Sequence, residues 1–86
     1  MNEIIFNGNK NVICKNLRRF RKKRGLTQDQ LAARMQVMNV NITQRLVSRI
    51  EHNERIVTDY ELACLCRALG VTVEDMLADF YEEFPE

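Results

Sequence analysis

The sequence predicts an all-α fold, a compact bundle of five short helices, on three observations. Apolar residues recur at helical spacing in five segments. Residues typical of helix starts and helix ends separate these segments. No segment shows the strict alternation of apolar and polar residues that marks a half-buried strand. With 86 residues, 45% of them hydrophobic and 29% charged, the chain has the composition of one small folded domain rather than of a disordered segment.

The first predicted helix begins near Asn11, because Asn7-Gly8-Asn9 before it is a turn signal. It ends at Gly25, since glycine suits the left-handed conformation that closes many helices. Its apolar face, spaced i, i+4 and i+7, consists of Ile13, Leu17 and Phe20.

The second and third predicted helices flank a connection over 36–42, which has no strong period and contains two asparagines. Thr27 opens the second helix, and Gln30 completes a capping box with it. Thr43 is the expected N-cap of the third helix, which Asn53 can close in the left-handed conformation. The residues expected to face inward are Leu31, Ala32 and Met35 in the second helix and Val47 and Ile50 in the third.

Two more helices are predicted in the second half of the chain. Thr58 and Glu61 form a capping box that opens the fourth helix, and Gly70 ends it. The segment from Thr72 to Asp75 opens the fifth helix in the same manner. The apolar residues of these helices are Leu62, Leu65 and Leu69 in the fourth and Met76, Leu77 and Phe80 in the fifth.

The net charge of +1 hides an uneven distribution of charge along the chain. Residues 1–55 contain twelve Lys or Arg and four acids, a balance of +8, whereas residues 56–86 contain one Arg and eight acids, a balance of −7. This asymmetry favours a first half that binds a polyanion, although charged faces also occur on proteins without such a ligand. No apolar run has the length of a membrane span, and residues 1–8 lack the order of a signal peptide, so we expect a cytoplasmic protein without a membrane partner.

The sequence carries no catalytic, cofactor or metal motif that we can identify. Cys64 and Cys66 stand two positions apart on a predicted helix and point in different directions, and with Cys14 they are expected to be small apolar side chains rather than metal ligands. His52 has no second histidine or cysteine at ligand spacing, and no nucleophile motif is present. We therefore expect neither an enzyme nor a protein that needs a cofactor or a metal.

The exposed face of the third predicted helix carries side chains that can read DNA bases. Arginine pairs with guanine O6 and N7, glutamine pairs with adenine N6 and N7, and a helix that presents them suits the major groove. The alternative is that these polar residues serve only solubility, and the residues alone do not decide between the two. The side chains opposite the apolar face are Gln44, Arg45, Ser48 and Arg49.

Five short motifs stand out between Leu17 and Leu77. They are Leu17–Arg21, Gly25–Gln28, Leu31-Ala32, Val47–Glu51 and Leu69–Val73. In this order they resemble the helix-turn-helix domain of phage Cro and CI repressors and their bacterial relatives, the XRE family. The resemblance implies a lambda-repressor-like fold in which the second and third helices form the helix-turn-helix. It also divides the chain into an N-terminal extension (1–10), a DNA-binding domain (11–78) and an acidic aromatic C-terminal tail (79–86).

The resemblance implies a sequence-specific transcriptional regulator, with repression as the expected outcome, that binds a double-stranded DNA operator as a homodimer. It assigns to base edges the residues Gln44, Arg45, Ser48 and Arg49. It assigns to backbone phosphates the residues Arg18, Thr27, Gln28, Thr43, His52, Asn53 and Arg55. It also implies an ion pair between Arg21 and Glu51, which ties the first helix to the end of the third.

The sequence departs from the family pattern at three positions. The stretch from Ala32 to Glu51 is about five residues longer than the usual spacing, and the additional residues fall within 36–41. Asn53 replaces a more usual glycine. Leu46 replaces a small polar residue, and we expect it to pack in the fold rather than to touch a thymine methyl group.

The tail over 79–86 mixes Phe80, Tyr81 and Phe84 with four acids. It is either a frayed end of the fifth helix or a contact surface for a second copy or another protein, because exposed aromatic side chains are costly unless covered. A second function class therefore stays open. In that class the chain is an antitoxin or another protein-interaction module, which uses the same fold and binds its partner through the tail.

Overall fold

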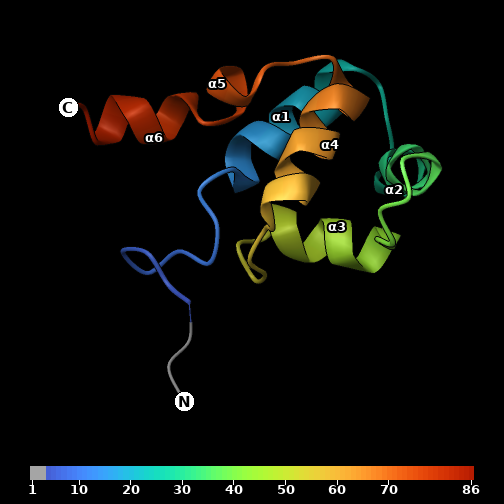
Figure 1. Cartoon of the computed structure of the whole chain (residues 1–86), viewed down its shortest axis with the longest axis horizontal. Helices are drawn as coiled ribbons and strands as arrows, with labels where there is room; N and C mark the ends of the chain where they lie inside the picture. The colour runs from blue at the N-terminus through green and yellow to red at the C-terminus, as the bar shows by residue number, and fades with distance from the viewer. Residues whose placement is uncertain (1–3) are drawn as a thin grey trace.

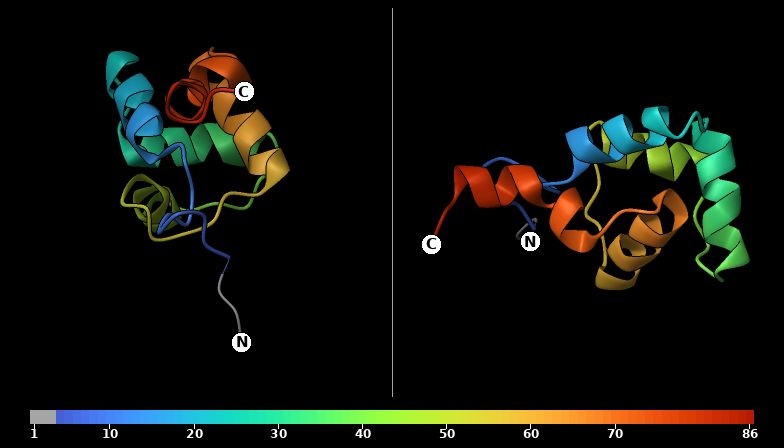
Figure 2. Two further views of the ribbon diagram at one scale, coloured as in Figure 1. Left: turned by 90° about the vertical axis from the view of Figure 1, so that its left-hand side faces the viewer. Right: turned by 90° about the horizontal axis from the view of Figure 1, so that it is seen from above.

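The computed structural model of the protein describes residues 4–86, which form six helices and no strand (Figure 1). The helices are α1 (Cys14–Lys23), α2 (Gln28–Val37), α3 (Gln44–Glu51), α4 (Asp59–Leu69), α5 (Val73–Met76) and α6 (Ala78–Glu83). Helices α1 to α5 gather into one body, and α6 projects from its side (Figure 2). The predicted all-α class is confirmed. No helix within 4–86 is both long and apolar enough to cross a membrane.

Four of these helices begin at a threonine whose hydroxyl oxygen accepts a backbone N–H of the first turn, as predicted. Three of the four starts are full capping boxes, in which the residue at the third helical position bonds back to the threonine N–H. The boxes pair Thr27 with Gln30, Thr58 with Glu61 and Thr72 with Asp75. Each such cap is worth about 1 kcal/mol, so local sequence alone places these helix starts.

Four helices end in the same way, at a residue with positive φ that closes a Schellman motif. These residues are Gly25 (φ 69°), Asn39 (φ 63°), Asn53 (φ 59°) and Gly70 (φ 67°). At the end of α2, the Asn39 N–H donates to the Gln36 carbonyl at 3.0 Å, and the Val40 N–H donates to the Met35 carbonyl at 3.1 Å. The sequence predicted three of these ends but not the one at Asn39. Helix α2 runs to Val37, farther than we expected.

The core lies where α1 to α5 meet. Its most deeply buried apolar side chains are Leu17, Leu31, Met35, Ile42, Val47, Ile50, Leu65, Leu69 and Met76. The inward faces predicted for α2 and α3 are confirmed, whereas Phe20, Leu62 and Leu77 are only partly buried against the core. The prediction that 36–42 is a plain connection was incomplete, because Val40 and Ile42 are both buried.

The predicted fifth helix is two helices in the structure. Leu77 separates α5 from α6, with φ −97° and ψ 9°. The buried side chain of Asn16 donates a hydrogen bond to the Met76 carbonyl at 3.2 Å, which holds the end of α5 to α1. The chain therefore changes direction at Leu77, and α6 leaves the body.

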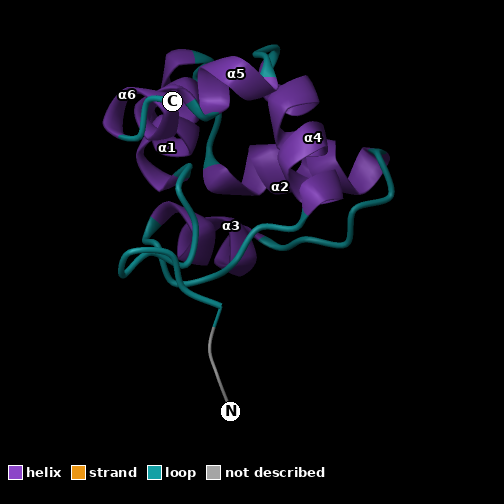
Figure 3. Cartoon of the chain, turned by 60° about the vertical axis from the view of Figure 1, so that its left-hand side comes forward, coloured by secondary structure: helices purple, strands orange, loops and turns teal. Residues whose placement is uncertain are grey.

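The N-terminal segment crosses the body beside α3 before α1 begins at Cys14, three residues later than predicted (Figure 3). The helix does not begin at Asn11 because the Asn11 side chain is hydrogen-bonded to the backbone of other segments. Its Nδ2 donates to the carbonyls of Ile50 at 3.0 Å and Arg55 at 2.9 Å, and its Oδ1 accepts the Ile13 N–H at 3.1 Å. Asn11 thus ties this segment to the end of α3.

Before Asn11 the chain makes a tight reversal, as the turn signal predicted. Asn7 and Gly8 both have positive φ, and Phe6 and Asn9 exchange two backbone hydrogen bonds of 2.8 Å. Two central residues with positive φ are the signature of a type I′ turn, which Asn-Gly favours. The turn places the Phe6 ring against Phe80 of α6.

Candidate nucleic-acid interface

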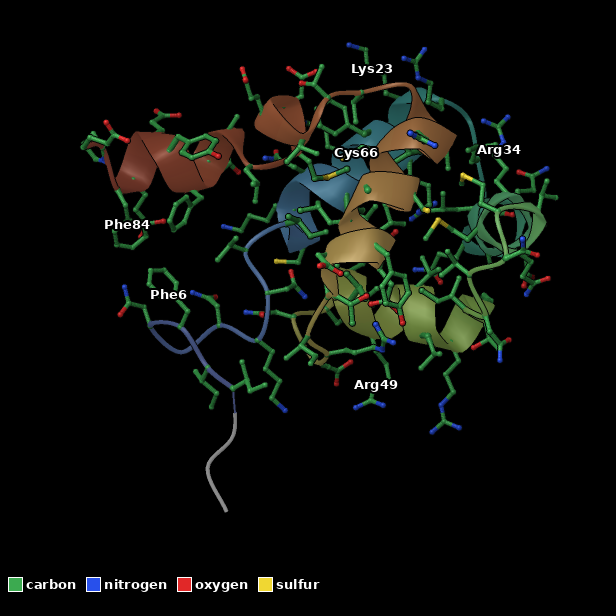
Figure 4. The ribbon with its side chains drawn as sticks, in the orientation of Figure 1. Phe6, Lys23, Arg34, Arg49, Cys66 and Phe84 are labelled. Atoms are coloured by element: carbon green, nitrogen blue, oxygen red, sulfur yellow. The ribbon has the colours of Figure 1, made fainter. Side chains whose placement is uncertain are left out.

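Helix α3 presents a polar face to solvent and buries the opposite face. Val47 and Ile50 are fully buried. Around the exposed side stand Gln44, Arg45, Ser48 and Arg49, of which Ser48 is half-buried and the other three are exposed. Figure 4 shows Arg49 pointing away from the body at the edge formed by α3. The helix therefore offers amide, hydroxyl and guanidinium groups together on one accessible surface.

A chain of hydrogen bonds connects the start of α3 to the start of α2. The Gln44 Nε2 donates to the Gln28 Oε1 at 2.7 Å. The Gln28 Nε2 in turn donates to the Glu51 Oε1 at 3.1 Å. Gln28 therefore holds Gln44 in one orientation, and Glu51 holds Gln28. An exposed glutamine that is restrained in this way loses less conformational entropy when it binds a ligand.

Glu51 is the buried centre of this network, with its side chain 1% exposed. The Arg21 Nε donates to one of its carboxylate oxygens at 2.6 Å, and another Arg21 nitrogen donates to the other oxygen at 3.0 Å. The hydrogen bonds from Arg21 to Glu51 raise the pKa of the Arg21 guanidinium further, against the opposing effect of burial. Arg21 also donates to the Leu26 carbonyl at 2.8 Å, so the pair joins α1, α3 and the turn before α2.

Arg18 reaches the same region from the exposed side of α1. It donates to the Glu51 carbonyl at 3.1 Å, and its side chain is 44% exposed. This hydrogen bond stabilises the last turn of α3, where backbone carbonyls lack helical partners. The exposed part of its guanidinium lies beside the α3 surface and is available to an anion.

The threonines that cap α2 and α3 are both exposed. Thr27 accepts the Gln30 N–H at 3.1 Å, and Thr43 accepts the Leu46 N–H at 3.3 Å. A hydroxyl that accepts in a cap can still donate its own proton. The starts of both helices also direct backbone N–H groups and the positive end of the helix dipole outward, a combination suited to phosphate.

Three residues after α3 that the sequence assigned to phosphate are partly or wholly engaged within the fold. The Asn53 Oδ1 accepts the N–H groups of Lys10 and Asn11, and its Nδ2 donates to the Asn9 side chain at 2.8 Å. The His52 Nδ1 lies 2.7 Å from the Ser48 carbonyl, although His52 remains exposed. The Asn53 contacts join residues 42 to 44 positions apart, so no local pattern in the sequence indicates them.

Arg55 forms the second strong ion pair of the protein. Its two terminal nitrogens each donate to one oxygen of Glu61 at 2.9 Å, and the Glu61 side chain is 4% exposed. These hydrogen bonds raise the pKa of Arg55. Burial acts to raise the pKa of Glu61, but hydrogen bonds from Arg55 and from the Thr58 N–H outweigh burial and lower it. The sequence did not predict this pair, although Glu61 is itself a member of the capping box recognised at Thr58.

Cations elsewhere on the molecule serve the fold or face other directions. Arg24 donates to the Leu69 carbonyl at 2.8 Å, and Arg34 donates to the Ala68 carbonyl at 2.9 Å, so both neutralise the end of α4. Figure 4 shows Lys23 and Arg34 on parts of the molecule well separated from Arg49. Arg24 and Arg34 therefore serve the end of α4 rather than the α3 surface.

The connection between α2 and α3 is anchored rather than loose. Val40 and Ile42 are buried in the core, and the Gln36 side chain donates to the Ile42 carbonyl at 2.8 Å. Leu46 is half-buried and packs against the core, as expected for packing rather than base contact. Val40 and Ile42, on either side of Asn41, thus fix the longer connection to the core, and α3 keeps a defined orientation.

Within 4–86, no group of three or more His, Cys, Asp or Glu side chains is placed to hold a metal ion. Cys14, Cys64 and Cys66 are free, and Cys66 is buried. Burial, with a smaller effect of the Asp75 charge, raises the pKa of the Cys66 thiol. Cys66 therefore has the character of a packed apolar side chain.

Comparison with known proteins agrees with this arrangement. The family described as Helix-turn-helix matches residues 17–76. The crystal structure of the clp gene regulator ClgR from C. glutamicum superimposes with a TM-score of 0.72 at 27% identity, covering 87% of this chain and 91% of that chain. No curated protein matched the chain in sequence. The matched region runs from within α1 to the end of α5 and includes every side chain of the α3 surface.

Proposed function

The chain belongs to the XRE family of helix-turn-helix DNA-binding regulators, and on this premise we propose that it represses transcription by binding a specific double-stranded DNA operator. The observation that carries the proposal is the exposed face of α3, which joins two guanidinium groups to a restrained glutamine. These groups match the hydrogen-bonding patterns of base edges in the major groove. The similarity to a gene regulator supports the same conclusion.

In the proposed complex, α3 enters the major groove and its exposed side chains meet base edges. Arg45 and Arg49 are exposed and charged, so each can donate two hydrogen bonds to guanine O6 and N7. Gln44 is already held by Gln28, and this restraint favours a single base partner at that position. Ser48 is half-buried beside them, and its short side chain contributes a hydroxyl group.

The phosphates on either side of the groove meet a second set of groups. We propose that Thr27 and Gln28 at the start of α2 and Thr43 at the start of α3 contact one strand, through hydroxyl, amide and backbone N–H donors. Arg18 and the exposed His52 lie where they can contact the backbone next to the ends of α3. Asn53 and Arg55 contribute by holding the segment after α3 in place beside the phosphates, because the Asn53 side chain binds the N-terminal segment and Arg55 pairs with Glu61.

We also propose that two copies bind paired half-sites, because one small helix reads too few base pairs to select a single operator. Helix-turn-helix dimers bind half-sites about one DNA turn apart, roughly 34–36 Å. Repression then follows if the operator overlaps the site where polymerase binds. Activation from a neighbouring site would instead need contacts between this chain and polymerase.

The test compares two kinds of variant on one operator and on a mutated operator. Arg45→Ala and Arg49→Ala should each weaken operator binding by about 1–3 kcal/mol and should relax the preference for the operator over the mutated duplex. Thr43→Val should weaken binding to both duplexes by a similar factor, because phosphate contacts carry no sequence information.

Lys23→Ala is the matched control, since it removes one positive charge at a site far from Arg49 (Figure 4). Fluorescence anisotropy titrations at fixed salt provide the dissociation constants. If Arg45→Ala and Arg49→Ala weaken binding to both duplexes equally, these side chains do not read bases. If Lys23→Ala weakens binding as much as they do, binding depends on overall charge rather than on α3.

A further inference from the structure

The exposed apolar side chains of the protein are concentrated on one side. Nine large hydrophobic residues are exposed among those described, and six of them belong to the N-terminal segment, the loop before α4 and α6. We call this surface the side face, and it comprises Ile4, Ile5, Phe6, Ile56, Tyr81 and Phe84. The first four of these residues line an open groove of about 640 Å³, together with Leu62, Leu77 and Phe80.

Aromatic contacts make the side face a defined surface rather than two loose ends. The Phe6 ring lies 5.7 Å from Phe80 and 5.2 Å from Phe84, and Phe80 lies 5.6 Å from Tyr81, between ring centroids. Tyr81 nevertheless remains 51% exposed and Ile4 remains 72% exposed. Monomeric proteins seldom leave so many apolar side chains together in water, so burial of this surface against a partner would be favourable.

The charges around the side face are of both signs. From Asp79 to the C-terminus, α6 and its extension carry four acids and no base. Lys10 lines the groove beside the N-terminal segment, whereas Lys15 lines a pocket together with Asp79 and Glu83 of the same copy. The acidic end of one copy and the Lys10 side of the groove of another are complementary when a two-fold axis brings them together.

The same charges decide how two copies would meet. Direct contact of α6 with α6 would bring two groups of four acids together, which like-charge repulsion opposes. A crossed contact instead places the acids of each α6 near Lys10 of the other copy. It also brings the exposed Tyr81 of each copy to the apolar groove of the other.

The direction of the side face fits a second copy. α6 extends sideways from the body, whereas Arg49 projects from the edge formed by α3 (Figure 4). A partner seated on the side face therefore leaves the exposed surface of α3 open. A two-fold axis beside α6 and roughly parallel to the direction of Arg49 would turn both α3 surfaces the same way.

We propose that the side face is the interface between two copies of this chain, in which the acidic aromatic α6 of each copy crosses onto the apolar groove and Lys10 of the other. The occupant is a second copy because the face supplies both halves of the contact. A different protein would need to supply a basic, apolar surface that this chain already carries.

The first test measures the oligomeric state of the full chain without DNA by sedimentation equilibrium over a range of concentrations. The wild type should be in reversible equilibrium between monomer and dimer. Tyr81→Ser and Ile4→Ser should each raise the dimer dissociation constant by roughly tenfold or more, since each change occurs twice in a symmetric interface. Circular dichroism checks that each variant is folded.

Val37→Ser is the matched control, because Val37 is 85% exposed at the end of α2, outside the side face. It should leave the dissociation constant unchanged. A wild-type chain that stays monomeric at every concentration overturns the proposal and leaves the face to another protein. A dimer that Tyr81→Ser and Ile4→Ser do not weaken overturns it as well, since the interface must then lie elsewhere.

The second test asks whether the contact is crossed. Lys10→Glu and Glu82→Lys should each weaken self-association by roughly fivefold to thirtyfold, because like charges then face each other at both contacts. An equimolar mixture of the two variants should restore association. In the mixed dimer, the carboxylate introduced at position 10 of one chain meets the ammonium group introduced at position 82 of the other, and the second contact keeps its native pair. A mixture no tighter than either variant alone contradicts the crossed arrangement.

These outcomes are separate from those of DNA binding. A chain with a disrupted side face keeps α3 intact and should bind an isolated half-site with unchanged affinity, while losing the additional affinity of a paired operator. If Arg45→Ala did not weaken DNA binding, the proposed function would be contradicted, whereas the proposed dimer interface would stand.

Discussion

The buried ion pair of Arg21 and Glu51 gives the most quantitative prediction for the fold. Glu51→Gln keeps the shape of the side chain but removes its charge and turns one acceptor oxygen into a donor. The Arg21 guanidinium, whose side chain is 11% exposed, then loses its charged partner at 2.6 Å and 3.0 Å. Removing one partner of a buried pair costs about 3–5 kcal/mol, because the remaining charge stays in the interior without compensation.

This cost is large in comparison with the stability of so small a protein. At about 0.05–0.15 kcal/mol per residue, a chain of this length has a free energy of unfolding of roughly 4–13 kcal/mol. Glu51→Gln should therefore remove a large share of it and lower the Tm by at least about 12 °C. Urea denaturation followed by circular dichroism, with a thermal scan, measures both quantities.

The double variant Arg21→Met with Glu51→Met is the informative control. It removes both buried charges and replaces them with apolar side chains, so its free energy of unfolding should lie within about 2 kcal/mol of the wild type. Its DNA binding should still fall, because Gln28 and Gln44 lose the group that positions them. A loss of less than about 1 kcal/mol in Glu51→Gln would refute the reasoning, since it would mean that the pair is effectively solvated.

Three further predictions follow from single contacts. Asn53→Gly, which restores the residue usual in the family and keeps the left-handed backbone at φ 59°, should destabilise the fold by about 1–3 kcal/mol in urea unfolding, because it deletes three hydrogen bonds to the N-terminal segment; an unchanged or higher stability would show that these bonds contribute nothing. Glu61 has a pKa below its ordinary value of 4.5, so the stabilisation by its pair with Arg55 is complete above that pH and is lost as the pH falls through the lowered pKa. The difference in unfolding free energy between wild type and Glu61→Gln should therefore be constant from neutral pH down to about 4.5 and shrink below it, and a difference that grows on acidification would contradict this sign. Cys66, buried and with a raised pKa, should react with iodoacetamide more slowly than the half-buried Cys64 in peptide mapping, and equal rates would argue against its burial.

The helix boundaries were predictable from sequence where local chemistry decides them. Thr27, Thr58 and Thr72 each stand three residues before a side chain that can complete a capping box, and the structure contains all three boxes. Gly25 and Gly70 end helices because they adopt positive φ without strain. These signals lie within a few residues, so they need no knowledge of the rest of the chain.

The missed features depend on contacts between distant parts of the chain. Val40 and Ile42 are separated by one residue, a spacing without helical period, and only the packed core shows that both are buried. The break at Leu77 was missed because the apolar period continues through it, while Asn16 and the Met76 carbonyl that it contacts are 60 residues apart in sequence.

The same reasoning applies to the candidate site. The exposed face of α3 could be predicted from periodicity, since Val47 and Ile50 define the buried side. The hydrogen bonds of the Asn53 side chain could not be predicted, because its partners lie 42 to 44 residues away in sequence. The family resemblance assigned Asn53 to phosphate, and in the structure its side chain holds the N-terminal segment.

The central claim, that α3 reads a specific paired operator, is tested most directly by selecting bound sequences from random double-stranded DNA at two salt concentrations. The account predicts enrichment of a palindromic site with half-sites about 10 base pairs apart, and affinity that falls steeply as salt rises. Weak binding with no enriched sequence at either salt concentration would contradict it and would indicate that the fold serves a protein partner instead.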